Sequence, residues 1–137
     1  MTRPADIELA SLEKIDPGEL RLLWVNDGHD GPLEAVVEHA GACCLMLLHH
    51  EDATSDRPYR WLLVRLSREE KAEEERLHAL YVEHVGEHWC FHGPTVEHPP
   101  PREEADPETF FAARRARAPV DVQESAVLGW ADELPEL

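Results

Sequence analysis

The chain has 137 residues, a length typical of one domain, and 42% of them are hydrophobic, which is enough for a buried core. Acidic residues number 29 against 13 lysines and arginines, so the formal net charge is −16 at pH 7. Proteins bind nucleic acids largely through Lys and Arg that neutralise phosphates, so this charge argues against direct binding of DNA or RNA and favours a basic protein partner.

The sequence predicts a cytoplasmic protein without a membrane partner. Residues 1–12 lack a basic end followed by an apolar run, and the longest apolar run, Ala42 to Leu48, is too short to cross a bilayer. The three cysteines are an odd number and include the adjacent Cys43 and Cys44, which lie in the apolar run and are interpreted as small buried hydrophobic residues. The strong preference for arginine over lysine suggests a bacterial source.

Four strands are expected in the first half of the chain, at Leu20 to Val25, Leu33 to His39, Ala42 to His50 and Tyr59 to Leu66. The third is almost wholly apolar, which is typical of a strand covered on both faces. The segment from Asn26 to Pro32 is rich in Asp, Gly and Pro and reads as a loop, and Ala40-Gly41 predicts a tight turn. Short connections require antiparallel pairing, so we expect an antiparallel meander.

The clearest local signal is Ser67 followed three residues later by Glu70, which predicts a capping box at the start of a helix. Further glutamates crowd the first turns, where the helix dipole favours negative charge, and the apolar residues come later. We therefore expect the C-terminal half of this helix to pack on the sheet and the helix to end at Gly86.

A second, short helix is predicted at Pro107 to Ala116, with Asp106 as its N-cap and with Phe110 and Phe111 as anchors. The expected fold is therefore α+β: a four-stranded antiparallel meander packed by one main helix. Residues 1–92 would form this core, and residues 93–137 would be an acidic, Pro-rich C-terminal extension that carries the short helix and is packed on or draped over the core.

One cluster of residues could bind a metal. His84 and His88 are four residues apart and could share a helix face, and Cys90 and His92 could add ligands that suit zinc. However, Gly86 lies between the two histidines, and the spacing matches no known zinc motif. Ordinary packing and surface histidines are the favoured interpretation, so we expect no cofactor and keep zinc as an alternative.

The stretch from Leu23 to Leu33, which ends in Asp30-Gly31-Pro32-Leu33, and the later step Val85-Gly86-Glu87-His88 carry a resemblance. Over residues 20–90 the sequence resembles small uncharacterised acidic bacterial proteins that have an Asp-Gly-Pro-Leu hairpin followed by a Glu-rich helix. The resemblance implies a hairpin followed by a helix and no catalytic residue.

No catalytic motif is recognisable, which favours a non-enzymatic interaction module of the accessory, immunity, antitoxin or defence kind that binds a basic protein. The alternatives are a metal-binding protein or metal-dependent enzyme that uses the His and Cys cluster, and a mimic of nucleic acid that uses the acidic helix face and the acidic tail. The residues expected to bind a partner are Glu70, Glu73, Glu74, Phe110, Phe111 and Trp130.

Overall fold

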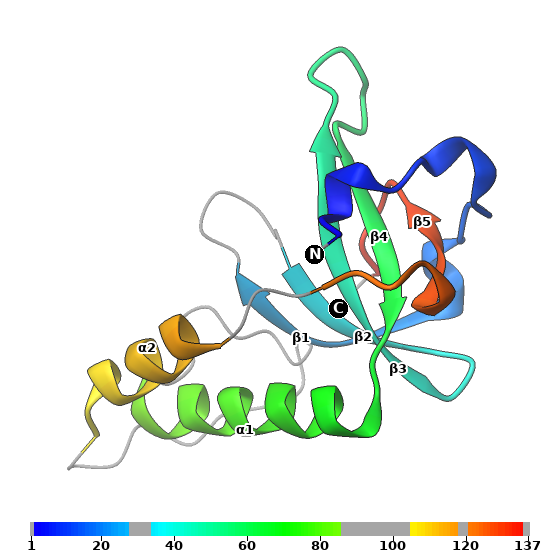
Figure 1. Ribbon diagram of the computed structural model, residues 1–137. Coiled ribbons are helices and arrows are strands. Elements are labelled where there is room, and N and C mark those ends of the chain that lie inside the picture. The colour runs from blue at the N-terminus through cyan, green and yellow to red at the C-terminus, as the bar shows by residue number, and fades with distance from the viewer. Residues whose placement is uncertain (1, 28–33, 86–104, 118–120, 136–137) are drawn as a thin grey trace.

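The computed structural model describes residues 2–27, 34–85, 105–117 and 121–135. Its strands are β1 (Leu20–Asp27), β2 (Glu34–His39), β3 (Ala42–Glu51), β4 (Tyr59–Arg65) and β5 (Val127–Ala131). Its helices are α1 (Arg68–His84) and α2 (Pro107–Ala116), which lie beside each other at one end of the sheet (Figure 1). The expected α+β class is confirmed.

The sheet has five strands in the order β1-β2-β3-β4-β5, and all neighbouring strands are antiparallel. The expected four-stranded meander is therefore close but incomplete, because β5 from the C-terminal segment pairs with β4 at the edge. The tight turn at Ala40-Gly41 is confirmed: both residues have positive φ, 50° and 83°, as a type I′ hairpin turn requires.

The middle of β3 is buried on both faces, as its apolar run predicts. Leu45 contributes to the core on one face of the sheet, whereas Cys44 and Met46 contribute to the core on the other face, and all three are 0% exposed. Successive residues of a strand point to opposite faces, so a strand needs a continuous apolar run when both faces are covered.

The chain before β1 packs against the outer edge of β5. The Ile15 backbone N–H donates to the Trp130 carbonyl at 2.8 Å, and the Trp130 N–H donates to the Glu13 carbonyl at 3.0 Å. Gly129 permits this close approach, because a Cβ placed there would lie 2.5 Å from the Glu13 carbonyl oxygen. The N-terminal segment and the C-terminal strand therefore stabilise each other.

We expect Gly129→Ala to lower the free energy of unfolding by about 1–3 kcal/mol, because the added methyl group forces two backbone segments apart. Gly18→Ala is the matched control, since a Cβ there meets only the Asp16 side chain at ordinary contact distance, 3.4 Å or more. Chemical denaturation measures both variants. Equal stability of the two would contradict the close packing of the N-terminal segment on β5.

Helix α1 begins as predicted. The Glu70 N–H donates to Ser67 Oγ at 3.1 Å, and the Ser67 N–H donates to Glu70 Oε1 at 2.9 Å, which completes the capping box. Its C-terminal half packs on the sheet: Leu77 is buried, and the His78 ring stacks on Trp24 with 4.5 Å between ring centroids. The helix ends at His84 with Val85 as its cap, and the predicted stop at Gly86 lies outside the described residues.

Helix α2 has the predicted bounds and the predicted cap, because the Asp106 carboxylate accepts a hydrogen bond from the Glu108 N–H at 3.1 Å. It is joined to the end of α1 by His84, whose Nδ1 accepts the Asp106 N–H at 3.1 Å. In the part of the chain that the structure describes, no helix is long and apolar enough to cross a membrane.

Candidate functional site

An open groove of about 630 Å³ runs along the first turns of α1, and we call it the acidic groove. Its apolar base comes from β3 and from the residue after β4, and its walls come from α1, the end of α2 and the segment before β5. The described residues that line it are Leu45, Leu66, Glu69, Glu70, Glu73, Glu74, Ala116, Arg117, Asp121 and Gln123.

Helical spacing explains why the acids of α1 lie together. Positions 69 and 73, and positions 70 and 74, are four residues apart and share one side of the helix. Glu70 is engaged in the capping box, and Glu73 accepts two hydrogen bonds from the Arg76 guanidinium at 2.7 and 2.9 Å. Among the described residues Glu69 has no ion-pair partner, so its carboxylate is available to a ligand.

The opposite wall is held by Asp121. Its carboxylate accepts the Thr2 N–H at 2.8 Å and the Gln123 side-chain amide at 2.7 Å. The next residue, Val122, is 1% exposed and belongs to the core, which fixes the position of this segment. Both walls of the acidic groove are therefore fixed in position. We call the sheet and α1 together the body of the protein.

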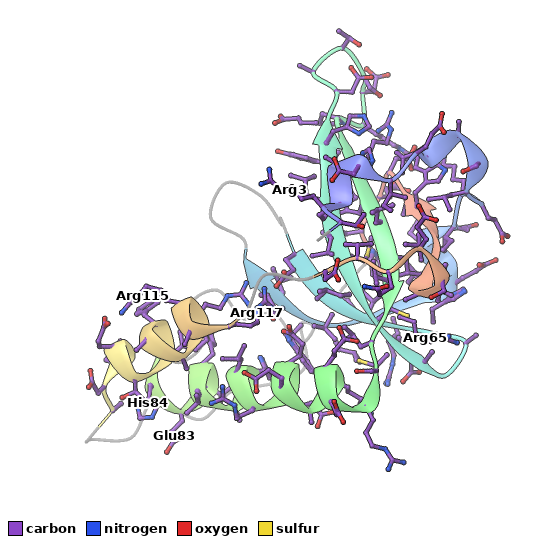
Figure 2. The ribbon with its side chains drawn as sticks, in the orientation of Figure 1. Arg3, Arg65, Glu83, His84, Arg115 and Arg117 are labelled. Carbon is purple, nitrogen blue, oxygen red and sulfur yellow. The ribbon has the colours of Figure 1, made fainter. Side chains whose placement is uncertain are left out.

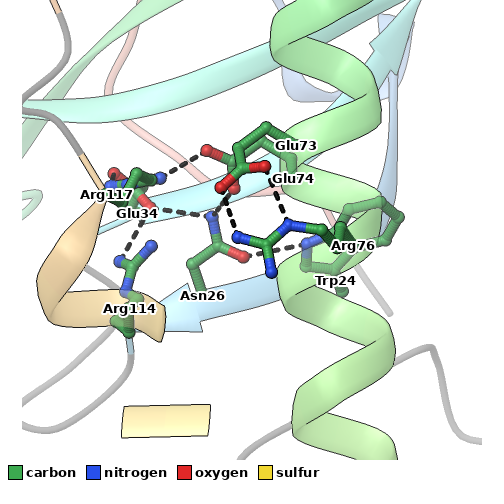
Figure 3. A network of polar contacts seen from close by, with 8 residues as sticks. All are labelled: Trp24, Asn26, Glu34, Glu73, Glu74, Arg76, Arg114 and Arg117. Carbon is green, nitrogen blue, oxygen red and sulfur yellow. Dashed lines mark hydrogen bonds and ion pairs between the residues drawn. The ribbon is translucent and has the colours of Figure 1, made fainter. Parts of the chain in front are cut away.

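At its inner end the acidic groove meets a buried charge cluster, which consists of Glu34, Glu74, Arg114 and Arg117 (Figure 3). Glu34 is 8% exposed and Glu74 is 4% exposed. Arg117 binds Glu34 at 3.0 Å and also contacts Glu74, and Arg114 binds Glu34 at 3.0 Å. The two acids of the body thus bind Arg114, which lies in the last turn of α2, and Arg117, which directly follows α2.

Asn26 joins the two buried acids. Its Nδ2 donates to Glu34 at 2.7 Å and to Glu74 at 2.9 Å, and its Oδ1 accepts the Trp24 indole N–H at 2.8 Å (Figure 3). The indole therefore fixes the amide orientation, and the amide fixes both carboxylates. Buried polar groups of this kind remain favourable only while each one keeps its partners.

Burial by itself would raise the pKa of Glu34, but the positive charges of Arg117 and Arg114 and the hydrogen bonds of Arg117 and Asn26 outweigh burial and lower it. For Arg117, burial would lower the pKa, and the contacts with Glu34 and Glu74 raise it instead. Both shifts favour the charged forms of Glu34 and Arg117 at neutral pH.

The lowered pKa of Glu34 predicts acid sensitivity. The folded state takes up the proton less readily than the unfolded state, so the stabilisation is complete above the ordinary pKa of 4.5 and is lost as pH falls through the lower folded pKa. We expect the free energy of unfolding, measured by denaturant titration across this range, to fall less steeply with acid in Glu34→Gln than in the unchanged protein. Glu108→Gln is the control, because that carboxylate is 63% exposed; equal slopes for both variants would contradict the prediction.

Phe110 and Arg117 are among the side chains that hold α2 on the body. Phe110 is 8% exposed and contacts the Tyr81 ring edge to face, with 5.2 Å between centroids. Arg117 lies between α2 and the body, whereas Arg115 lies on the outer side of the helix (Figure 2). Of the two expected anchors, Phe110 packs inward, and Phe111 is 44% exposed.

The other residues expected to bind a partner are now placed. Glu70, Glu73 and Glu74 all line the acidic groove, although Glu74 is buried within the charge cluster. Trp130 lies on β5, away from α2 (Figure 1), and the charged groups of Lys14 and Arg60 lie 5.5 and 5.8 Å from its ring centroid. Partner binding at these positions stays a prediction.

Of the expected metal ligands, only His84 falls within the described residues; His88, Cys90 and His92 lie outside them. His84 already accepts the Asp106 N–H through Nδ1, which gives it a structural role between α1 and α2. In the described ranges no group of three or more His, Cys, Asp or Glu side chains is arranged to hold a metal ion.

The adjacent cysteines are both free and lie in β3; Cys44 is buried as expected, whereas Cys43 is half-buried. Burial raises the pKa of the Cys44 thiol to about 11, and burial also raises the pKa of Cys43. Both thiols are therefore protonated at neutral pH and are poor nucleophiles.

Several residues of the site are not among those expected from the sequence. Glu69 could have been included, because it stands four residues before Glu73 and shares its helix face. Asp121, Arg114 and Arg117 carry no local signal, since only the tertiary fold brings them to α1.

Comparison with protein-family models, with curated proteins and with solved structures gives no match.

Proposed function

We propose that this protein is a non-enzymatic interaction module whose acidic groove holds a basic segment of a protein partner. The observation that carries the proposal is the lining of the groove: the carboxylates of Glu69, Glu70, Glu73 and Asp121 surround the half-buried Leu66, and the buried Glu74 and Leu45 lie beneath them. Arg117 is the one cation among the described lining residues, and it already binds two buried acids.

This lining selects the chemistry of the ligand. Guanidinium and ammonium groups would pair with the exposed acids on α1 and at Asp121, and an aliphatic side chain between them would cover the apolar base. A segment that alternates basic and aliphatic residues meets both requirements. The formal charge of −16 would also speed the approach of such a partner.

An acidic module with this groove fits the role of an accessory, immunity or antitoxin-like subunit that neutralises a basic protein. Electrostatic complementarity contributes to association rate and specificity, which are the properties that such a subunit needs.

The test uses a fluorescent peptide of alternating arginine and leucine and a matched peptide with glutamine in place of arginine. Fluorescence anisotropy should show binding of the arginine peptide that weakens steeply as salt rises, and little binding of the glutamine peptide. Equal binding of both peptides, or binding of neither, would overturn the proposal.

A further inference from the structure

The buried charge cluster joins two distant parts of the chain. Its two acids, Glu34 on β2 and Glu74 on α1, belong to the body, whereas the guanidinium groups come from residues 114 and 117 at the far end of the chain. Glu34 and Glu74 are 8% and 4% exposed, and a buried carboxylate without a cationic partner is costly, so this place in the body favours a cation.

Side chains of the body also orient the two carboxylates independently of the arginines. Asn26 donates to both carboxylates, and the Trp24 indole fixes the amide of Asn26. The remaining carboxylate oxygens, Oε1 of each acid, accept the two terminal nitrogens of one guanidinium, Nη1 on Glu74 and Nη2 on Glu34. A planar group with two parallel N–H donors matches this spacing, and an ammonium, which is a single point charge, does not.

Arg117 lies where the acidic groove and the buried charge cluster meet. Both Arg117 and Glu74 line the acidic groove. Arg117 is the C-cap of α2, and its extended backbone, with φ −62° and ψ 128°, turns the chain out of the helix at this residue. A basic segment lying in the groove would therefore bring its own side chains next to this pocket.

We propose that Asn26, Glu34 and Glu74 form a guanidinium-binding pocket, which Arg117 fills as an internal occupant and which an arginine of the bound partner takes over. This inference rests on the proposed function and adds to it the preference for arginine over lysine. Exchange of the two arginines would remove the contacts of Arg117 with the body, so the last turn of α2 would loosen when the partner binds, while Arg114 and Phe110 keep their own contacts.

The pocket can be tested without any partner. In Arg117→Ala the cavity left by the side chain should bind ethylguanidinium about tenfold or more tightly than the unchanged protein does, which appears as a larger rise in melting temperature at equal ligand concentration. Ethylammonium at the same ionic strength should give no such rise. Arg115→Ala is the matched control, since Arg115 is on the same helix with a side chain that is 65% exposed.

If ethylguanidinium stabilises Arg117→Ala no more than Arg115→Ala, the guanidinium pocket is overturned, whatever the groove binds. If Arg117→Ala does not fold, the unchanged protein gives the answer through hydrogen exchange. Amides of α2 should then exchange faster with the arginine–leucine peptide than with a lysine–leucine peptide, and equal exchange would overturn the inference. The arginine peptide could fail to bind the acidic groove while ethylguanidinium still stabilises Arg117→Ala. That result would overturn the proposed function and the replacement of Arg117 by a partner arginine, and it would leave the guanidinium pocket standing.

Discussion

Replacing Arg117 with leucine is expected to lower the free energy of unfolding by about 3–5 kcal/mol, because the change leaves buried carboxylates without their cation. Among the described residues, Glu74 would keep only the Asn26 amide, and Glu34 would keep Asn26 and Arg114. Desolvation of an unpaired carboxylate is the main contribution to this cost.

Arg115→Leu is the control for this prediction. Arg115 and its partner Glu108 are 65% and 63% exposed, and an exposed pair contributes only about 0–1 kcal/mol. Denaturant titrations of the two variants at neutral pH should therefore differ clearly. If Arg117→Leu loses no more stability than Arg115→Leu, the buried charge cluster does not hold α2 on the body.

A double substitution separates a missing charge from a missing contact. When Glu74→Leu is combined with Arg117→Leu, the stranded carboxylate is removed together with its partner, so the double variant should be more stable than the sum of the two single changes predicts. Strict additivity would show that Glu74 and Arg117 act independently.

Charge reversal in the acidic groove has the second largest expected effect. Glu69→Lys with Glu73→Lys replaces two attractive pairs by two repulsive ones, and the affinity for the arginine–leucine peptide should fall roughly ten- to a hundredfold at low salt. The loss should shrink as ionic strength rises. Fluorescence anisotropy at several salt concentrations measures both effects.

A second double variant separates the effect of the total charge on peptide affinity from the effect of where the charges lie. Glu75→Lys with Glu108→Lys changes the total charge by the same amount, but both carboxylates lie away from the groove and are 54% and 63% exposed. This control should keep most of the affinity of the unchanged protein. An equal loss in both double variants would show that the peptide responds to the overall field and does not occupy the groove.

Much of the fold is predictable because its signals are local. The capping box at Ser67, the turn at Ala40-Gly41 and the cap at Asp106 each depend on a few consecutive residues, and the structure has all of them. The apolar run of β3 likewise indicates burial on both faces without knowledge of its neighbours.

The missed features all depend on distant parts of the chain. Strand β5 is short, and it becomes a strand because β4 on one side and the chain around Ile15 on the other both bind its backbone. The buried charge cluster is similar: Glu34 and Arg117 are 83 residues apart in sequence, and each alone resembles a surface residue. No pattern in a single sequence states that they meet.

The most direct test of the proposed function is an NMR titration of isotope-labelled protein with the arginine–leucine peptide. If the acidic groove binds basic segments, backbone amides at residues 67–74, 116–117 and 121–123 should shift together with one saturation curve. Shifts confined to other surfaces, such as the Lys14 and Arg60 side of β5, or no saturable shift at all, would contradict it.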